Sequence, residues 1–395
     1  MDVQSVGKSS RKCWGQGFWG LFTIDFYRLY VCLLAACVLA MMGIINMVAR
    51  GGSIHGTMSM GWIALQFWCL CFLLYLCSPR VARWIAKLAS SASQGTRRGM
   101  SGQRLKKRTH LGRGSWFSFV SSEMQGWRDA MEDAIVCAPN PAGMPEESSL
   151  FAVFDGHGGA EASARAAEQV VSRVSARFEQ GLEAGPALKQ ALLDIEAELR
   201  KQNTPLAGYR ERCRFDYVGC TAAVVVLDPR TVTVANVGDS RVFKCRKGEC
   251  IPLTRDHKPE SPRERRRIEA AGGTVMKLGP CHRVDLSLNL SRSLADFQYK
   301  DPCLPPEEQK ISPVADIVVA DIDQDDEFLV VACDGIFELM TWTTACEFIR
   351  SRINCMPLDQ IAEALLEACC STNVLATRGL GTDNESLIIV KLHSS

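Results

Sequence analysis

The sequence predicts an α+β fold with antiparallel sheet, preceded by a hairpin of two membrane-spanning helices. Short β-rich runs fill most of the chain after residue 115, and a pair of helical segments interrupts them between residues 161 and 201. Because strands and helices do not alternate regularly, a layered α+β domain is favoured over a parallel sheet of βαβ units. Two long apolar runs without charge in the first 77 residues predict the hairpin.

The composition is that of a folded protein with nearly balanced charge. Of the 395 residues, 47% are hydrophobic, which excludes wholesale disorder. A net charge of +1 argues against a nucleic-acid partner. The eighteen cysteines are scattered and form no CxxC pairs, so neither a disulfide scaffold nor a zinc module is predicted. A catalytic part facing the reducing cytosol fits this cysteine usage.

The first predicted element is the membrane hairpin over residues 29–77, after a cytoplasmic segment at residues 1–28. Residues 29–49 and 58–77 form charge-free runs of 21 and 20 residues. Each is long enough to cross ~30 Å of hydrocarbon as a helix, and a pair of buried core helices is the alternative. Basic residues precede the first run and follow the second, so both ends are expected to face the cytoplasm.

Residues 78–114 are predicted to form a basic juxtamembrane linker. Residues 80–113 contain ten Lys or Arg and no acidic residue. Such a stretch fits either contact with anionic lipid head groups or a solvated linker. The catalytic domain is then expected to span residues 115–395.

Within this domain, β-branched and alternating apolar residues indicate strands, whereas apolar spacing of three and four among helix-forming residues indicates helices. The predicted strands are residues 134–137, 150–154, 220–227, 231–237, 241–245, 328–333 and 386–392. The predicted helices are the pair between residues 161 and 201, and residues 261–271 and 358–370.

Several carboxylates stand at the ends of these strands, beside glycine or another small residue. Asp155 follows LFAVF, Asp334 follows FLVVAC, and Asp239 follows VTVANVG. Glu132 and Asp133 lie just before a predicted strand, and Asp383 lies just before the last one. Ordinary Asp-Gly turns are the alternative for any one of them.

If strand ends bring these carboxylates to one edge, they repel one another and require positive charge among them. Hard divalent cations with oxygen ligands fit this requirement, and one carboxylate could bridge two ions. Magnesium or manganese suits an all-oxygen ligand set, whereas zinc would call for more His or Cys. The sequence therefore predicts a site for Mn²⁺ or Mg²⁺.

A family resemblance follows from motifs spread over the same region. The segments SSEMQGWRDAMEDA, LFAVFDGHGG, GCTAAVVVL, VANVGDSRVF, LTRDHKP, LSRSLADFQYK, FLVVACDGIFELM and GTDNESLIIV stand in the order found in one enzyme family. Over about residues 115–392 the chain resembles the metal-dependent protein serine/threonine phosphatases of type 2C. The resemblance implies a β-sandwich of two antiparallel sheets flanked by helices. It also implies that a metal-bridging water attacks phosphorus directly.

The resemblance implies roles for individual residues as well. Asp155 is expected to bridge two ions, with Glu132 and the carbonyl of Gly156 on one, and Asp334 and Asp383 on the other. The remaining matches are Arg128 as the phosphate-binding residue, His157 as the general acid, Thr221 as support for a ligand, Asp133 as orienter of a bound water, and Asp239 as ligand of a weak third metal.

The chain departs from the family pattern in two places. Glu338 stands where the family usually has Asp, which is expected to reshape a third metal site. Near the family's flap, Asp285, Leu286, Asn289 and Ala295 replace the more usual Asn, Gly, Ala and Gly. These departures therefore predict an unusual substrate choice.

The overall prediction is a membrane-anchored Mg/Mn-dependent phosphatase that hydrolyses phosphoserine and phosphothreonine in proteins, with its catalytic domain facing the cytoplasm. Two alternatives remain open at this point. One is a catalytically inactive scaffold that binds phosphoproteins at a membrane. The other is hydrolysis of a small phosphorylated metabolite, since the chemistry at phosphorus would be the same.

Overall fold

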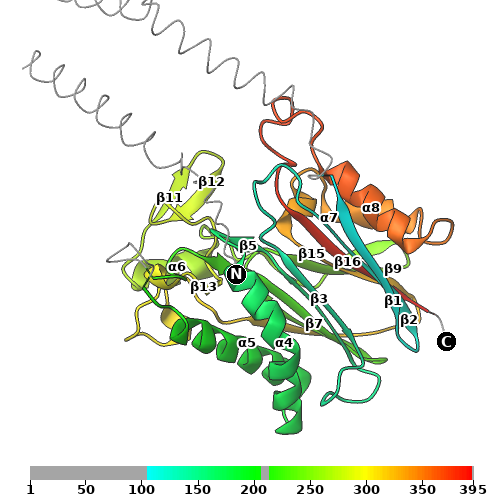
Figure 1. The fold of residues 1–395 in the computed structure, drawn as a ribbon, viewed down its shortest axis with the longest axis horizontal. Coiled ribbons are helices and arrows are strands. Elements are labelled where there is room, and N and C mark those ends of the chain that lie inside the picture. The colour runs from blue at the N-terminus through cyan, green and yellow to red at the C-terminus, as the bar shows by residue number, and fades with distance from the viewer. Residues whose placement is uncertain (1–104, 206–212, 394–395) are drawn as a thin grey trace, which may run out of the picture. The chain divides into compact units, whose positions relative to one another are not determined.

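The computed structural model describes residues 105–205 and 213–393, which belong to one unit of the chain, residues 98–395. Two antiparallel sheets form its centre (Figure 1). The first sheet has the order β1 (Lys107–Arg113), β2 (Phe117–Met124), β16 (Glu385–Leu392), β15 (Asp326–Ala332), β9 (Arg241–Arg246) and β10 (Glu249–Pro252). The second has the order β14 (Asp316–Asp321), β8 (Thr231–Val237), β7 (Ala222–Leu227), β4 (Ser149–Phe154) and β3 (Ala134–Pro139).

Helices pack on the outer face of each sheet, so the predicted sandwich flanked by helices is confirmed. The helices are α4 (Glu161–Glu179), α5 (Ala184–Lys201), α6 (Pro262–Ala270), α7 (Trp342–Arg350) and α8 (Leu358–Cys369). The first two contact the second sheet, while α7 and α8 contact the first. On α4, buried Ala162, Ala166, Val170 and Val174 recur at every fourth position and form the stripe that faces the sheet.

The main core lies between the two sheets. Phe117 and Phe119 of β2 meet Phe151 of β4 edge to face, with ring centroids 5.8 and 5.3 Å apart. Every residue of β4 is buried, because its other face lies under α4. This two-sided burial explains why the strand is a continuous apolar run instead of an alternating one.

Two small sheets complete the fold. The strands β13 (Leu294–Ala295), β6 (Gly219–Cys220) and β5 (Gly156–His157) form a short three-stranded sheet, and β11 (Val275–Leu278) pairs with β12 (Cys281–Val284) as a hairpin. The single strand predicted at residues 220–227 is therefore wrong. The strand is interrupted at Thr221, so that β6 joins the small three-stranded sheet and β7 (Ala222–Leu227) joins the second sheet.

The first sheet begins before the boundary predicted at residue 115. Strand β1 lies within the stretch predicted as a linker, and its first two basic side chains have acidic partners. Lys107 forms an ion pair with Glu367 of α8, and Arg108 Nε lies 2.6 Å from Glu123 Oε1 of β2. The basic run is thus in part an edge strand whose charges are paired across the sheet and its covering helix.

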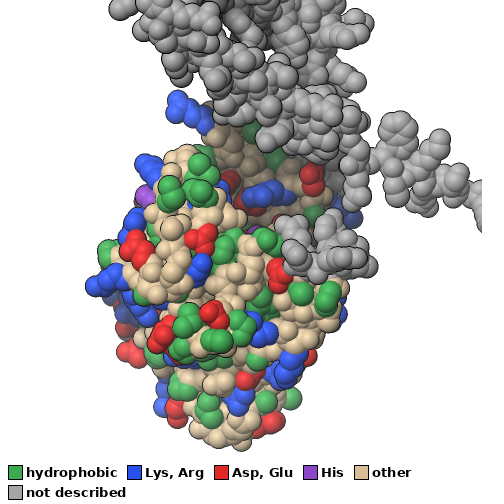
Figure 2. Space-filling model, turned by 90° about the vertical axis from the view of Figure 1, so that its left-hand side faces the viewer, with side chains coloured by type: hydrophobic (Ala, Val, Ile, Leu, Met, Phe, Trp, Pro, Cys, Tyr) green, Lys and Arg blue, Asp and Glu red, His purple; other side chains and the backbone are tan. Residues whose placement is uncertain are grey.

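Within the residues that the structure describes, no helix is long and apolar enough to cross a membrane. The predicted hairpin at residues 29–77 lies outside these residues, as do residues 1–28 and most of the predicted linker. On the face of the described unit shown in Figure 2, Lys and Arg side chains are interspersed with Asp and Glu side chains.

Candidate metal centre

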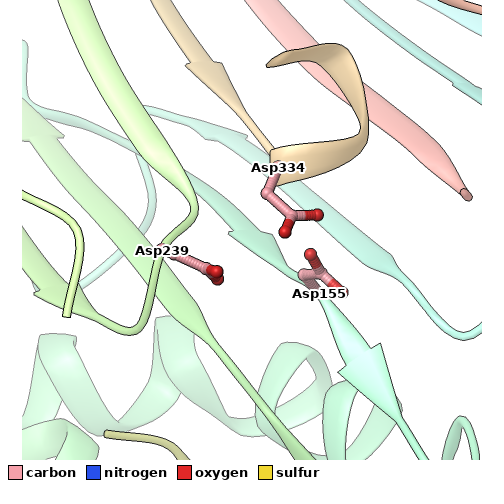
Figure 3. Close-up of side chains that lie close together, drawn as sticks. All are labelled: Asp155, Asp239 and Asp334. Atoms are coloured by element: carbon pink, nitrogen blue, oxygen red, sulfur yellow. The ribbon is translucent and has the colours of Figure 1, made fainter. Parts of the chain in front are cut away.

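Three aspartates from three strand ends lie together at one end of the sandwich. Asp155 follows β4, Asp239 follows β8, and Asp334 begins the short 3-10 helix η3 (Asp334–Phe337) that follows β15. One oxygen from each carboxylate lies within 4.8 Å of the others. In Figure 3 the three side chains point toward a common centre. The predicted convergence of Asp155, Asp239 and Asp334 is therefore present.

The cluster is electrostatically unfavourable without a cation. Burial, followed by the charges of Asp133, Asp334 and Asp239, raises the pKa of Asp155 well above its usual range. Burial and the charge of Asp239 likewise raise the pKa of Asp334. Carboxylates at this spacing fit an all-oxygen site for hard divalent cations, which would remove the repulsion.

Asp133 gives a second indication that a ligand belongs here. Both of its carboxylate oxygens are buried and accept no hydrogen bond of good geometry from the described residues, although the Ser386 and Cys333 side chains partly oppose the rise in its pKa. Burial raises the pKa of Asp133 to about 7. Because an unpartnered buried carboxyl is costly, a bound cation or its water would satisfy these oxygens.

The glycines of both Asp-Gly pairs are required by close backbone contacts. A Cβ on Gly156 would clash with the carbonyl oxygen of Glu132, and a Cβ on Gly335 would clash with that of Asn384. Neither glycine has a positive φ, so space and not backbone conformation demands them. Each glycine thus lets the segment carrying another predicted ligand approach the strand end.

Asn384 joins the loops that carry Glu132 and Asp383. Its Oδ1 accepts a hydrogen bond from the Glu132 N–H at 2.9 Å, and its Nδ2 donates to the carbonyls of Gln125 and Ala130 at 2.9 and 3.0 Å. Asn384 is not among the residues predicted for the site. Its position directly after a predicted ligand, in GTDNES, was the available signal.

Arg128, the predicted phosphate-binding residue, contacts a predicted metal ligand. Its Nη2 lies 2.6 Å from Asp383 Oδ2, and 54% of its side chain is exposed. The guanidinium is therefore at the site and accessible from solvent.

Two further residues singled out from the sequence, Thr221 and Glu338, accept hydrogen bonds from backbone N–H groups. Thr221 Oγ1 accepts from the Asp155 N–H at 3.1 Å. Glu338 Oε2 accepts from the N–H groups of Gly381 and Thr382 at 2.6 and 3.0 Å.

Asp239 differs from the other two aspartates in having a built-in cationic partner. Its side chain is buried, and the Lys258 ammonium donates a hydrogen bond to it. Burial opposes the charge of Lys258, but Asp239 and Asp334 raise its pKa above the ordinary lysine value. Lys258 was not predicted, although it lies in the quoted motif LTRDHKP.

His157 has a buried acidic partner, Asp296, that was not predicted. Its Nε2 lies 2.7 Å from Asp296 Oδ2. Burial lowers the pKa of His157, but the charge and hydrogen bond of Asp296 outweigh this and raise it. Asp296 lies in the quoted motif LSRSLADFQYK, far from His157 in sequence, so only the fold reveals the pair.

Known proteins are similar to this chain over the part that forms the two sheets and their helices. The family model of protein phosphatase 2C matches residues 117–375. The chain is 37% identical over 297 residues to protein phosphatase 2C homolog 2 of Schizosaccharomyces pombe, covering 72% of this chain and 76% of that one. It is 35% identical over 309 residues to probable protein phosphatase 2C 3 of Paramecium tetraurelia, covering 74% and 98% of the two chains.

Among solved structures, a phosphatase from Toxoplasma gondii superposes with a TM-score of 0.60 at 25% identity, over 73% of this chain and 96% of that one. Residues 117–375 include the second sheet, the first sheet except β1 and β16, and all three clustered aspartates. The chain therefore belongs to the protein phosphatase 2C family and is a protein serine/threonine phosphatase.

Proposed function

We propose that this phosphatase depends on two Mg²⁺ or Mn²⁺ ions and releases phosphate from phosphoserine and phosphothreonine of protein substrates at a membrane surface. The observation that carries the proposal is the cluster of Asp155, Asp239 and Asp334 within 4.8 Å. Asp155 would lie between two ions, Glu132 and the Gly156 carbonyl would bind one, and Asp334 and Asp383 would bind the other. Asp239 would contribute to a weaker third site.

Bound ions would lower the pKa of the attacking water and offset the carboxylate charge. The chain's own residues would do the rest. Arg128 is accessible and presents a planar guanidinium that can bind two phosphoryl oxygens, in exchange for its bond to Asp383. His157 would donate a proton to the leaving seryl or threonyl oxygen. Asp133 would accept a hydrogen bond from a water at the site.

The membrane part of the proposal rests on the sequence. Two charge-free apolar runs precede the catalytic domain, and the basic residues on both flanks favour the cytoplasmic side for it. The basic residues between the second run and β1 would lie near anionic lipid head groups.

The test of metal dependence uses the full chain in detergent with a phosphothreonine peptide. We expect release of phosphate with Mn²⁺ or Mg²⁺, loss of activity with EDTA, and recovery when Mn²⁺ is added in excess. Asp334→Asn should lower kcat by orders of magnitude, because it removes a charged ligand from the centre. Asp194→Asn, which removes a carboxylate paired with Arg177 on the helical layer, serves as the control. Undiminished turnover in EDTA would refute the proposal.

A further inference from the structure

We infer that Asp296 is a positioning residue that holds the His157 imidazole in the orientation from which it protonates the leaving group. This inference rests on the proposed function, because it assigns a partner to the proposed acid. The hydrogen bond between His157 Nε2 and Asp296 Oδ2 is 2.7 Å long and joins residues 139 positions apart in the chain.

The difference in burial between the two side chains separates their roles. Only 1% of the Asp296 side chain is exposed, compared with 26% of the His157 side chain. A substrate can therefore reach the imidazole and cannot reach the carboxylate. Asp296 must therefore act through His157. Its hydrogen bond fixes the orientation of the imidazole ring and keeps a proton on Nε2.

The small three-stranded sheet brings the two residues together. His157 of β5 is paired with Gly219 of β6, and Gly219 is paired in turn with Ala295 of β13. A Cβ on Gly219 would clash with the Asp296 carboxylate and lie 2.8 Å from His157 Nε2. The central strand of this sheet thus needs glycine at the position where the imidazole and the carboxylate meet.

The backbone that delivers Asp296 is strained and firmly held. Ala295 and Asp296 both have left-handed backbone, with φ of 61° and 53°. Left-handed backbone is unfavourable for Ala295 and less so for an aspartate, so neighbouring contacts must hold the conformation. Glu196 supplies them: its Oε2 accepts from the Ala295 N–H at 2.7 Å, and its Oε1 accepts from Lys300 at 2.8 Å, in a fully buried ion pair.

The carboxylate itself is fixed by a second donor, because the Ser293 hydroxyl also donates a hydrogen bond to Asp296 Oδ2. The Glu196–Lys300 ion pair thus holds the backbone before Asp296, and Ser293 holds its carboxylate. The partly exposed partner of this carboxylate is His157. A carboxylate with only a packing role would not need this precise presentation to a half-buried imidazole.

The reaction step shows why orientation matters. The oxygen of water forms a bond to phosphorus as the water releases one proton to solvent, and its other proton stays on the product phosphate. The ester P–O bond breaks, and its electron pair remains on the leaving oxygen. The proton on the His157 imidazolium passes to that oxygen, and the neutral imidazole regains a proton from solvent. A seryl or threonyl oxygen leaves poorly without this proton, whereas a nitrophenolate is stable without it.

The test compares two substrates on the full chain in detergent with Mn²⁺: a phosphothreonine peptide and p-nitrophenyl phosphate. For Asp296→Asn, we expect kcat on the peptide to fall about 10- to 100-fold, with a change within about 3-fold on the aryl phosphate, because only the peptide needs the acid. His157→Asn should show the same selective loss. The double variant should be no slower than His157→Asn alone.

Asp316→Asn is the matched control, because it removes the carboxylate of a second His–Asp pair, with His257 at 3.2 Å, outside the proposed catalytic groups. It should leave the ratio of the two rates unchanged. Ser293→Ala removes one donor to Asp296 and should show the selective loss in smaller measure, which keeps the test usable if Asp296→Asn folds poorly. Equal losses on both substrates, or additive losses in the double variant, would overturn the inference. Absence of any peptide turnover by the wild type would instead refute the proposed function.

Discussion

Arg292 illustrates how single residues stabilise the domain away from the metal centre. Only 2% of its side chain is exposed, and it binds Glu264 of α6 with two hydrogen bonds of 3.0 and 2.6 Å. Arg267 also donates to Glu264, and Arg292 reaches Asp316 at 2.8 Å. A buried charge is costly without a counter-charge. The Glu264 carboxylate therefore stabilises both Arg267 and Arg292.

We therefore expect Glu264→Gln to lower the free energy of unfolding by about 3–5 kcal/mol at pH 7, because it removes the carboxylate partner of Arg267 and leaves the buried Arg292 with Asp316 alone. Urea titrations at several pH values measure this effect. Glu269→Gln on the same helix is the control, because its partner Arg265 is 3.5 Å away on the surface; it should cost less than about 1 kcal/mol.

The effect of Glu264 should also depend on pH. Burial opposes the ionisation of Glu264. The hydrogen bonds and charges of Arg292 and Arg267 outweigh burial and lower the pKa of Glu264 from 4.5 to about 2. The unfolded chain therefore binds this proton first as the pH falls, so the stabilisation is complete above about pH 4.5 and is lost toward pH 2. A difference between wild type and variant that stays constant from pH 7 to pH 3 would contradict this account.

At the scale of elements, the metal centre depends on strand ends that nearly touch. The strand end carrying Asp334 lies against the segment carrying Asp383, since the Gly335 Cα faces the Asn384 carbonyl with no space for a methyl group. The same relation joins Gly156 to the Glu132 carbonyl. These glycines set the separation between ligand-bearing segments.

Gly335→Ala should accordingly push the two segments apart. We expect a loss of about 1–3 kcal/mol in stability from overpacking, together with a marked rise in the Mn²⁺ concentration needed for half-maximal activity. Thermal unfolding and a metal titration measure the two effects. Gly185→Ala in α5 is the comparison, because its Cβ would meet only the Ile317 Cγ2 methyl at 3.1 Å, and alanine favours the helix. Equal metal requirements for the two variants would argue against this role for Gly335.

The sequence predicted the elements with a simple apolar pattern and missed those defined by partners elsewhere in the fold. Strand β8 was placed with its observed bounds, since TVTVANV is β-branched and buried. Strand β1 was taken for linker, because its basic side chains are paired only once α8 and β2 lie beside it. The hairpin of β11 and β12, with Met276 and Leu278 exposed, has no amphipathic pattern to recognise.

The candidate site shows the same division. The strand-end carboxylates Asp155, Asp239 and Asp334 could be found from sequence because glycine and apolar runs mark strand ends. The groups that hold the site in place, Asn384, Lys258 and Asp296, contact it across 19 to 252 positions of sequence. No local pattern predicts such contacts.

At the scale of the whole molecule, the proposed membrane attachment depends on the segments that precede the first sheet. The first described strand is β1 (Lys107–Arg113). The basic stretch before it would connect the proposed spans at residues 29–77 to the first sheet. Within β1, the charges of Lys107 and Arg108 already have carboxylate partners in Glu367 and Glu123. Any lipid contact must therefore come mainly from the basic residues before β1.

We expect the full chain to remain in the membrane pellet after extraction at pH 11, because two apolar spans are retained by the hydrophobic effect, whereas a surface-bound protein held by charge is released. Deletion of residues 29–77 should move the chain to the supernatant while leaving the basic stretch intact, which separates the contribution of the spans from that of the lipid head groups. Protease added to the cytoplasmic side of sealed vesicles should digest the catalytic domain of the full chain. Release of the full chain at pH 11 would rule out the hairpin, and protection of the catalytic domain from protease would rule out the orientation that the flanking basic residues predict.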